Sequence, residues 1–375
     1  MARPRITVGM HLPPKPPVVT LRALAYASRL MRLESLTVWD HVQDLFPQSL
    51  WDEDFTWLAR LSKSPHEMLD YQVTLGYLAA HAGRLRLGVG VTEAIRRHPV
   101  LIAQSMATLA HVSRRAPILG IGTGERENVE PYGLSMSWSV SRLEEALQII
   151  RLCWTSAGPV DFDGRFYTLT QAALDLQPPP KRVPRIWVAA HGPRMLDLTG
   201  RYGDGWLPVL VTDPDDYAAR LATIRAAAQT AGRDPAAILP AMQAYVVAAP
   251  TEREAREMLG APPIRFIAVL APAEMWRRHG VVHPFGDDFR GFFDYVPSEH
   301  TREQLLDAMA RVPVDALAEV LMWGTPAQIA ARIRAFGEAG LRHANLELAS
   351  AAVSPRAAAN SLRAIWQIRR LVNAR

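Results

Sequence analysis

Short apolar runs alternate with amphipathic helical stretches along nearly the whole chain of 375 residues. Such runs are typical of buried strands, and a helix between successive strands favours a parallel sheet. Eight runs fit this pattern: Ile6–Met10, Ser35–Trp39, Leu85–Val89, Ile118–Ile121, Ile186–Ala190, Gly205–Pro208, Gln243–Ala248 and Ala344–Leu348. Eight parallel strands are what a closed barrel needs, so we predict an α/β fold, the (β/α)8 TIM barrel.

Helical patterns occupy the gaps between these runs, and several begin with proline, which is tolerated in the first turn of a helix. The predicted helices are Leu21–Arg32, Val100–His111, Ser141–Trp154, Pro193–Arg201, Pro214–Ala231, Pro326–Ala339 and Pro355–Val372. Each of them lies between two predicted strands or after the last one, as the barrel requires.

Three stretches exceed a minimal barrel, which takes about 250 residues. They lie near 42–72, 158–184 and 261–323, and the second contains a hairpin-like piece, Phe162–Tyr167. We predict a single domain, 1–375, with these stretches as insertions at the C-terminal face of the strands. Aromatic-rich insertions there either shape a substrate pocket or simply pack over the barrel.

Titratable side chains follow two of the predicted strands. Asp40 and His41 come directly after the second strand, and the fourth strand runs into Gly122-Thr123-Gly124-Glu125. Because the C-terminal ends of barrel strands meet at one face, these groups indicate an active site there. Two simpler alternatives stay open: Asp40-His41 as a pair that only ends a strand, and Glu125 as a first-turn carboxylate that favours the helix dipole.

Composition and charge exclude several other classes of protein. The net charge is +5, but the arginines are scattered and form no basic stripe with aromatic residues, so we predict no nucleic-acid partner. The N-terminus lacks the apolar core of a signal peptide, and no apolar run approaches membrane-spanning length. We therefore expect a cytoplasmic protein with no integral membrane segment, and leave peripheral membrane contact open.

No metal site is predicted. Cys153 is the only cysteine, which excludes an internal disulfide, and its apolar helical neighbourhood predicts a buried thiol. His279 and His283 have no carboxylate partner nearby in the sequence. Gly120 to Gly124 do not match a dinucleotide fingerprint, because Glu125 stands where the third glycine would be needed.

Several motifs together resemble the luciferase-like oxidoreductase superfamily: Arg97-His98-Pro99, Ala103–Leu109, Leu119–Glu125, Ile186–Met195 and Gly200–Trp206. Within it, Asp40-His41 with Gly122–Glu125 and Asn128 is similar to the deazaflavin branch, which uses coenzyme F420. Glu130–Gly133 and Trp276–Val281 are similar to the corresponding segments of phthiodiolone ketoreductase-type proteins.

This resemblance implies a barrel with an insertion region, usually dimeric, with the cofactor across the C-terminal strand ends. It implies that the deazaflavin ring and its side chain contact five residues: Asp40, Thr92, Thr123, Gly124 and Asn128. It places the ribityl phosphate at a helix N-terminus, a favourable site for anions, formed by His191, Gly192, Arg194 and Met195. It also implies a non-proline cis peptide near Val89–Val91. His191 has a plainer alternative as a packed turn residue.

Two departures argue against a sugar-phosphate substrate. Relatives that oxidise sugar phosphates carry a lysine where this chain has about Thr212, and a tryptophan where it has Leu45. A third departure, Ser113–Pro117, replaces the usual Ser-Gly-Gly-Arg turn before the fourth strand and leaves that turn's geometry open.

These residues predict hydride transfer accompanied by the transfer of one proton between the protein and the substrate. An imidazole suits proton exchange with a carbonyl or hydroxyl oxygen, so we assign His41 that role and Glu125 proton exchange with the ring. Asp40 is expected to orient His41 or to bond the ring. The predicted activity is an F420-dependent ketoreductase or alcohol dehydrogenase, acting on a small or lipid-like substrate. The alternatives are an FMN-dependent monooxygenase and a cofactor- or lipid-binding protein without activity.

Overall fold

Parallel pairing between neighbouring strands closes the predicted barrel. The structure is a computed structural model that describes residues 5–374. Its barrel strands are β1 (Thr7–Leu12), β2 (Ser35–Val38), β3 (Arg86–Thr92), β4 (Ile118–Ile121), β7 (Arg185–Val188), β8 (Gly205–Trp206), β9 (Leu239–Ala248) and β11 (His343–Glu347). Each strand pairs with the next, and β11 pairs with β1 to complete the ring. All eight predicted strands are confirmed, with ends that differ by a few residues.

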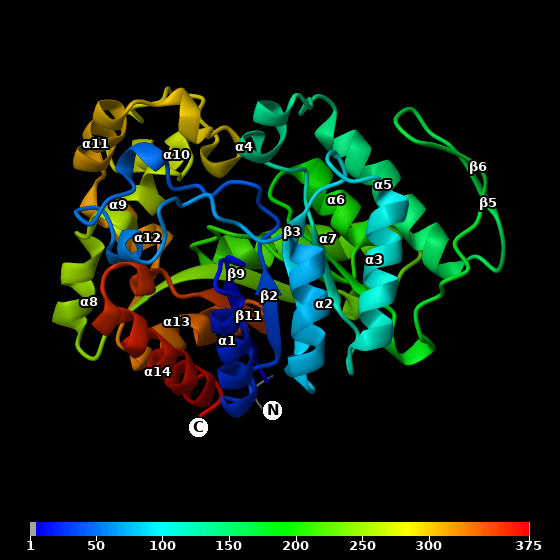
Figure 1. Cartoon of the computed structure of the whole chain (residues 1–375), viewed down its shortest axis with the longest axis horizontal. Coiled ribbons are helices and arrows are strands. Elements are labelled where there is room, and N and C mark those ends of the chain that lie inside the picture. Colours follow the sequence, from blue (N-terminus) through cyan, green and yellow to red (C-terminus); the bar gives the residue numbers. More distant parts are fainter. Residues whose placement is uncertain (1–4, 375) are drawn as a thin grey trace.

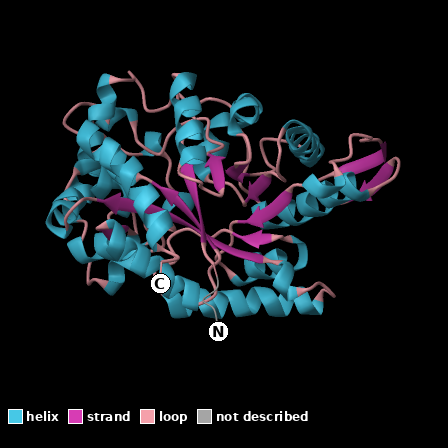
Figure 2. Ribbon diagram, turned by 90° about the horizontal axis from the view of Figure 1, so that it is seen from below, coloured by secondary structure: helices cyan, strands magenta, loops and turns pink. Residues whose placement is uncertain are grey.

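Helices surround these strands, as Figure 2 shows. They are α1 (Val18–Leu30), α2 (Tyr71–Ala82), α3 (Pro99–Val112), α5 (Ser139–Thr155), α6 (Pro193–Tyr202), α7 (Pro214–Thr230), α13 (Pro326–Glu338) and α14 (Pro355–Leu371). The seven predicted helices are among them. The eighth, α2, begins after Asp70, whose carboxylate accepts hydrogen bonds from the backbone of Gln72 and Val73.

One continuous cluster of buried apolar side chains joins the barrel to its helices. It includes Leu36 from β2, Ile102 from α3 and Phe336 from α13, all without solvent exposure. Cys153 belongs to the same cluster, which confirms the predicted buried thiol. In the described residues, no helix combines the length and the apolar character needed to cross a bilayer.

The second insertion forms the predicted hairpin. Strands β5 (Val160–Asp163) and β6 (Thr168–Ala172) pair antiparallel and project to the right in Figure 1. Glu145 of α5 closes the turn, because its carboxylate accepts the backbone N–H groups of Arg165, Phe166 and Tyr167.

The first and third insertions pack against each other at the upper left of Figure 1. The first contains η1 (Gln48–Leu50) and η2 (Trp57–Arg60), and the third contains α9 (Pro262–Val269), α10 (Ala273–Arg278), η6 (Gly291–Phe293), η7 (Pro297–Glu299), α11 (Arg302–Arg311), α12 (Val314–Val320) and β10 (Met322–Gly324). They share a second apolar cluster in which Phe46 and Phe55 meet Phe266. The predicted aromatic insertions therefore share a second core, which also includes Tyr245 and Val247 of β9.

The remaining elements are short, apart from one helix. They are α4 (Arg126–Val129), η3 (Glu130–Tyr132), η4 (Pro180–Arg182), η5 (Pro235–Ala237), α8 (Glu252–Leu259) and η8 (Ala349–Ala352). Helix α8, which we did not predict, follows β9 and begins at Thr251, whose hydroxyl accepts the backbone N–H of Glu254.

Gly120 is a packing residue between two neighbouring strands. A Cβ atom at this position would overlap the carbonyl oxygen of Val89 and lie 3.1 Å from Gly90 Cα. Strands β3 and β4 can approach each other only because residue 120 has no side chain. The peptide between Gly90 and Val91 is cis, which confirms the prediction for this part of β3.

We predict that Gly120→Ala lowers the free energy of unfolding by about 3 kcal/mol, since the added methyl group collides with rigid backbone. Urea denaturation measures this change. Gly158→Ala is the control, because no atom lies within 4 Å of its added Cβ. Equal stability of the two variants would contradict the packing role of Gly120.

Candidate active site

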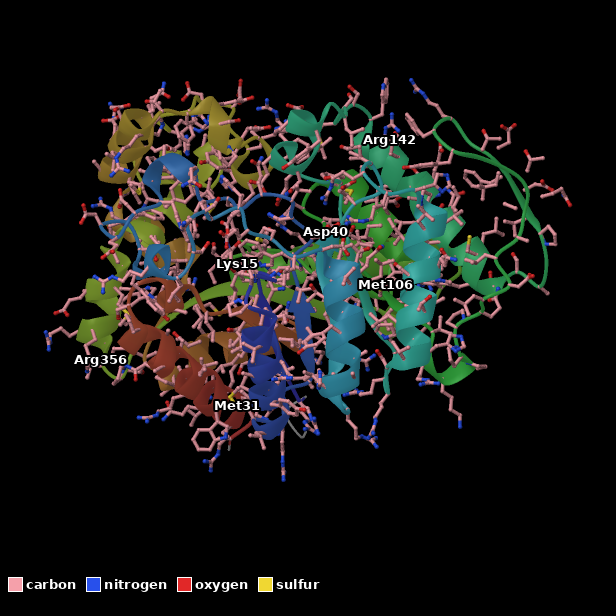
Figure 3. All side chains as sticks on the ribbon, in the orientation of Figure 1. Lys15, Met31, Asp40, Met106, Arg142 and Arg356 are labelled. Atoms are coloured by element: carbon pink, nitrogen blue, oxygen red, sulfur yellow. The ribbon has the colours of Figure 1, made fainter. Side chains whose placement is uncertain are left out.

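The predicted catalytic groups meet at the C-terminal rim of the barrel. Asp40 and His41 follow β2, Thr92 ends β3, and Glu125 follows β4; these three strands are neighbours in the sheet. Figure 3 labels Asp40 near the centre of the molecule, at this rim. The structure thus brings together the residues that sequence reasoning assigned to proton transfer.

His41 lies between two carboxylates. Its Nε2 is 3.5 Å from Glu125 Oε2, and its Nδ1 is 2.9 Å from Glu127 Oε1, an ion-pair contact that lacks the alignment of a hydrogen bond. Glu127 is fully buried, whereas Glu125 keeps 32% of its side chain exposed. Sequence reasoning missed Glu127, because a charged residue two positions after Glu125 carries no mark of burial.

Asn128 fixes the segment that carries His41 to α4. Its Nδ2 donates to Glu127 Oε1 at 2.9 Å, and its Oδ1 accepts from the backbone N of Val42 at 2.8 Å. Gln43 adds a bond from its Nε2 to the carbonyl oxygen of Glu127, at 2.6 Å. The amide of Asn128 is therefore already engaged within the protein, and its predicted contact with a cofactor stays a prediction.

The charges around His41 favour its protonated form. Burial by itself would lower the pKa of His41, but Glu127, Glu125 and Asp44 outweigh burial and raise the pKa to about 9. Burial raises the pKa of Glu127 to about 7 against the opposing effect of His41, and it also raises the pKa of Glu125. At neutral pH the site therefore holds His41 as an imidazolium.

His41, Glu125 and Glu127 each have a nitrogen or oxygen atom within 4.8 Å of the others, a spacing at which such groups can hold a metal ion. Attraction between an imidazolium and two carboxyl groups explains this convergence without a cation. That the working site needs no metal ion therefore stays a prediction.

The carboxylate of Asp40 contacts two arginines and not the His41 ring. Its carboxylate accepts two bonds from Arg97 Nη1, at 2.9 and 2.7 Å, and one from the Thr92 hydroxyl at 2.6 Å. Arg96 Nη2 lies 3.1 Å from the same carboxylate. No hydrogen bond joins Asp40 to His41 in the described part of the chain, so the expectation that Asp40 orients His41 is corrected: Glu127 makes the contact. Ring contacts of Asp40 and Thr92 stay predictions.

A second pair of titratable groups lies beside His41 at the ends of β1 and β11. His11 has its Nδ1 2.7 Å from the Thr37 hydroxyl and its Nε2 4.0 Å from Glu347 Oε2. Burial, together with the charge of His41, lowers the pKa of His11 to about 3. Burial raises the pKa of Glu347 to about 8. Both groups are therefore mainly uncharged at neutral pH.

The predicted phosphate site lies at the start of α6. Gly192 precedes the first helical residue, and His191, Gly192 and Arg194 are exposed. The Arg194 guanidinium already contacts Ser141 Oγ at 2.9 Å and Glu144 Oε2 at 3.2 Å. The Met195 side chain is buried in the barrel core, so only its backbone N–H can serve an anion.

Gly124 stands at the turn between β4 and α4. It has a φ of +88°, in the left-handed region, and a Cβ there would lie 3.0 Å from Glu93 Cγ. Glycine is required here to direct Glu125 and α4 towards His41. Thr123, just before it, is partly exposed.

Arg126 connects the catalytic segment to the third insertion. This residue stands between Glu125 and Glu127 in α4; its Nη1 donates to the carbonyl oxygen of Asp294 at 2.9 Å and its Nη2 to Glu299 Oε1 at 2.7 Å. Its Nε also bonds Glu130 Oε2 at 2.6 Å. In Figure 1 α4 accordingly lies beside the yellow segment after α10.

The family model of luciferase-like monooxygenases matches residues 54–343, well over half of the chain. The chain belongs to the luciferase-like monooxygenase family. It is 40% identical over 332 residues to a phthiodiolone/phenolphthiodiolone dimycocerosates ketoreductase of Mycobacterium tuberculosis, covering 88% of this chain and 87% of that protein. It is 36% identical over 196 residues to an F420-dependent hydroxymycolic acid dehydrogenase of the same organism, covering 51% and 52%.

Among solved structures, the chain resembles an F420-dependent secondary alcohol dehydrogenase in complex with an F420-acetone adduct. The TM-score is 0.76 at 22% identity, over 98% of this chain and 99% of that one. At this identity the likeness concerns the fold, and it agrees with the barrel of this family member.

We predict that Glu347→Gln flattens the dependence of stability on pH. The folded-state pKa of Glu347, about 8, lies above its ordinary value of 4.5, so stability from the bound proton is present below pH 4.5 and is lost as pH rises through 8. The wild type should therefore lose about 1.4 kcal/mol per pH unit relative to the variant across that interval. Urea denaturation at several pH values measures this loss.

Glu338→Gln on the exposed face of α13 is the matched control and should follow the wild type at every pH. Parallel curves for Glu347→Gln and the wild type would show that Glu347 ionises normally in the folded protein.

Proposed function

We propose that this protein is an oxidoreductase that transfers hydride between coenzyme F420 and a ketone or secondary alcohol. The observation that carries the proposal is the placement of His41 between Glu125 and Glu127 at the mouth of a luciferase-like barrel. The F420-dependent dehydrogenase and the ketoreductase among its relatives support the same reaction class. By the same resemblance, we propose one domain, acting as a cytoplasmic homodimer.

The residues present fit this cofactor. Trp39 Nε1 and Glu127 Oε2 are buried polar atoms without a hydrogen-bond partner in the described residues, which is the situation expected of a polar ring site. Exposed backbone N–H groups at the start of α6 suit a phosphate. We propose that Asp40, Thr92, Thr123, Gly124 and Asn128 form the ring site, and that His191, Gly192, Arg194 and Met195 form the phosphate site.

Coenzyme F420, when bound, supplies or accepts a hydride at one carbon. The protein manages the proton. His41 exchanges it with the substrate oxygen through Nε2, because Nδ1 faces Glu127. Glu125, which is partly exposed, exchanges a proton with solvent or with the ring and balances charge there.

An apolar, lipid-like substrate is the finer part of the proposal. Aromatic side chains of the third insertion reach the barrel rim, where Phe292 stacks on Tyr245 of β9 with ring centroids 6.0 Å apart. Tyr245 is buried and lies near Glu347 and Glu125. An aromatic wall beside the proton-transfer groups favours a substrate that is apolar around its reacting carbon.

The main rival is a monooxygenase, as the family's description indicates, which we expect to use FMN. A protein that purifies with bound FMN would favour it. The other rival is a cofactor- or lipid-binding protein without turnover, for which replacement of His41 would change no reaction.

We predict that the protein binds coenzyme F420 and that His41→Asn lowers F420-dependent turnover about 100-fold or more, because general acid–base catalysis of this size is lost. Fluorescence titration measures the affinity, and absorbance of the deazaflavin measures turnover. Affinity of the variant should stay close to that of the wild type.

His111→Asn, at the exposed end of α3, is the control and should keep full turnover. An affinity weaker than about millimolar for both oxidised and reduced F420 would exclude the proposed cofactor.

A further inference from the structure

The side of His41 that faces away from Glu125 is covered by a carboxylate with no access to water. Glu127 is fully buried, its Oε1 lies 2.9 Å from His41 Nδ1, and the same oxygen accepts a bond from Asn128 Nδ2. Its carbonyl oxygen is bonded by Gln43, so the backbone of residue 127 is also fixed to the segment that follows β2. This geometry holds the imidazole from one edge and leaves Nε2 towards the mouth.

We propose that Glu127 is a positioning residue that keeps His41 charged through neutral pH, so that the site works as the acid of carbonyl reduction. This inference rests on the proposed function and adds to it the residue that sets the working pH range. Glu127 does not alter the equilibrium between ketone and alcohol; it decides at which pH the proton needed for reduction is present on His41.

Other charged groups around His41 come from four elements. Glu125 lies in the same segment as Glu127, Asp44 in the first insertion, Glu347 at the end of β11 and His11 in β1. Asp44 is neutralised by Lys15, whose Nζ lies 2.8 Å from Asp44 Oδ2. His11 and Glu347 are mainly uncharged at neutral pH, as described above.

Glu125 is the other carboxyl group that could keep His41 charged. Glu125 is partly exposed and lies 3.5 Å from His41. The positive charges of His41 and Arg96 both lower the pKa of Glu125. Glu127 is closer, at 2.9 Å, and has no water to weaken its charge. Charge interactions are stronger where solvent is excluded, so Glu127 has the larger effect on His41.

The reaction balances with these groups. Reduced coenzyme F420, when bound, would supply a hydride to the carbonyl carbon, and the carbonyl oxygen would take the proton from His41 Nε2. The ketone would become the alcohol, the cofactor would be oxidised, and His41 would be left neutral beside Glu127. A proton from solvent, passed by Glu125 at the mouth, restores the imidazolium.

The test is Glu127→Gln, which keeps the size of the side chain and an oxygen for the Asn128 bond. The first measurement is the titration of His41 by NMR with ¹⁵N-labelled histidine, on the full chain without cofactor, with the signal assigned by its loss in His41→Asn. We expect the midpoint to fall by at least about one pH unit in Glu127→Gln. Glu127→Asp, which keeps the charge, should recover part of the shift.

The second measurement is the pH profile of kcat for ketone reduction with reduced F420. The high-pH limb should move down by the same amount as the NMR midpoint, while KM and F420 affinity change less than about threefold. Glu130→Gln is the matched control, because it removes an exposed carboxylate of the neighbouring η3 turn and should shift neither quantity.

Two outcomes overturn the inference, and they differ in cause. An unchanged His41 midpoint in Glu127→Gln removes the role of Glu127, even if the wild type turns over F420. A shifted midpoint in a wild type that neither binds nor oxidises reduced F420 shows that the ion pair exists but that the proposed function, and with it the role in carbonyl reduction, is wrong.

Discussion

Closure of the barrel between β1 and β11 places a carboxyl group of the last strand beside the histidines at the ends of the first two strands. This pairing brings the last strand of the chain against the first, so His11 and Glu347 become neighbours although they are far apart in sequence. The next three strands carry Asp40, Thr92 and Glu125 to the same rim. Without this pairing Glu347 would lie at the other end of an open sheet, away from His11 and His41.

Burial and neighbouring charges then set the protonation states of the groups at the C-terminal rim of the barrel. Two ordinary histidines in one site acquire opposite character: His11 is kept neutral by removal from water, whereas His41 is kept charged by Glu127. The carboxyls divide in the same way, since Asp40 is fully engaged with Arg96, Arg97 and Thr92 while Glu347 holds its proton. Opposite protonation states of neighbouring groups are a common property of acid–base sites.

The strands and helices could be predicted because their apolar periods are local properties of the sequence. The convergence of His41 and Glu125 followed from strand order, which makes all C-terminal ends meet. Glu127 and Glu347 could not be recognised, because their burial depends on segments distant in the chain. The expected orientation of His41 by Asp40 was wrong for a related reason: Arg97, on another segment, takes that carboxylate. The helices of the third insertion were missed because they are short and pack partly against the first insertion, which is distant in sequence.

The contacts of Arg126 link recognition to chemistry. The Arg126 guanidinium bonds Asp294 and Glu299 of the third insertion. In the sequence, Arg126 stands between the two carboxyl residues that flank His41. A substitution in the third insertion that moves Asp294 or Glu299 would therefore act, through one arginine, on the segment that carries both carboxyl groups beside His41.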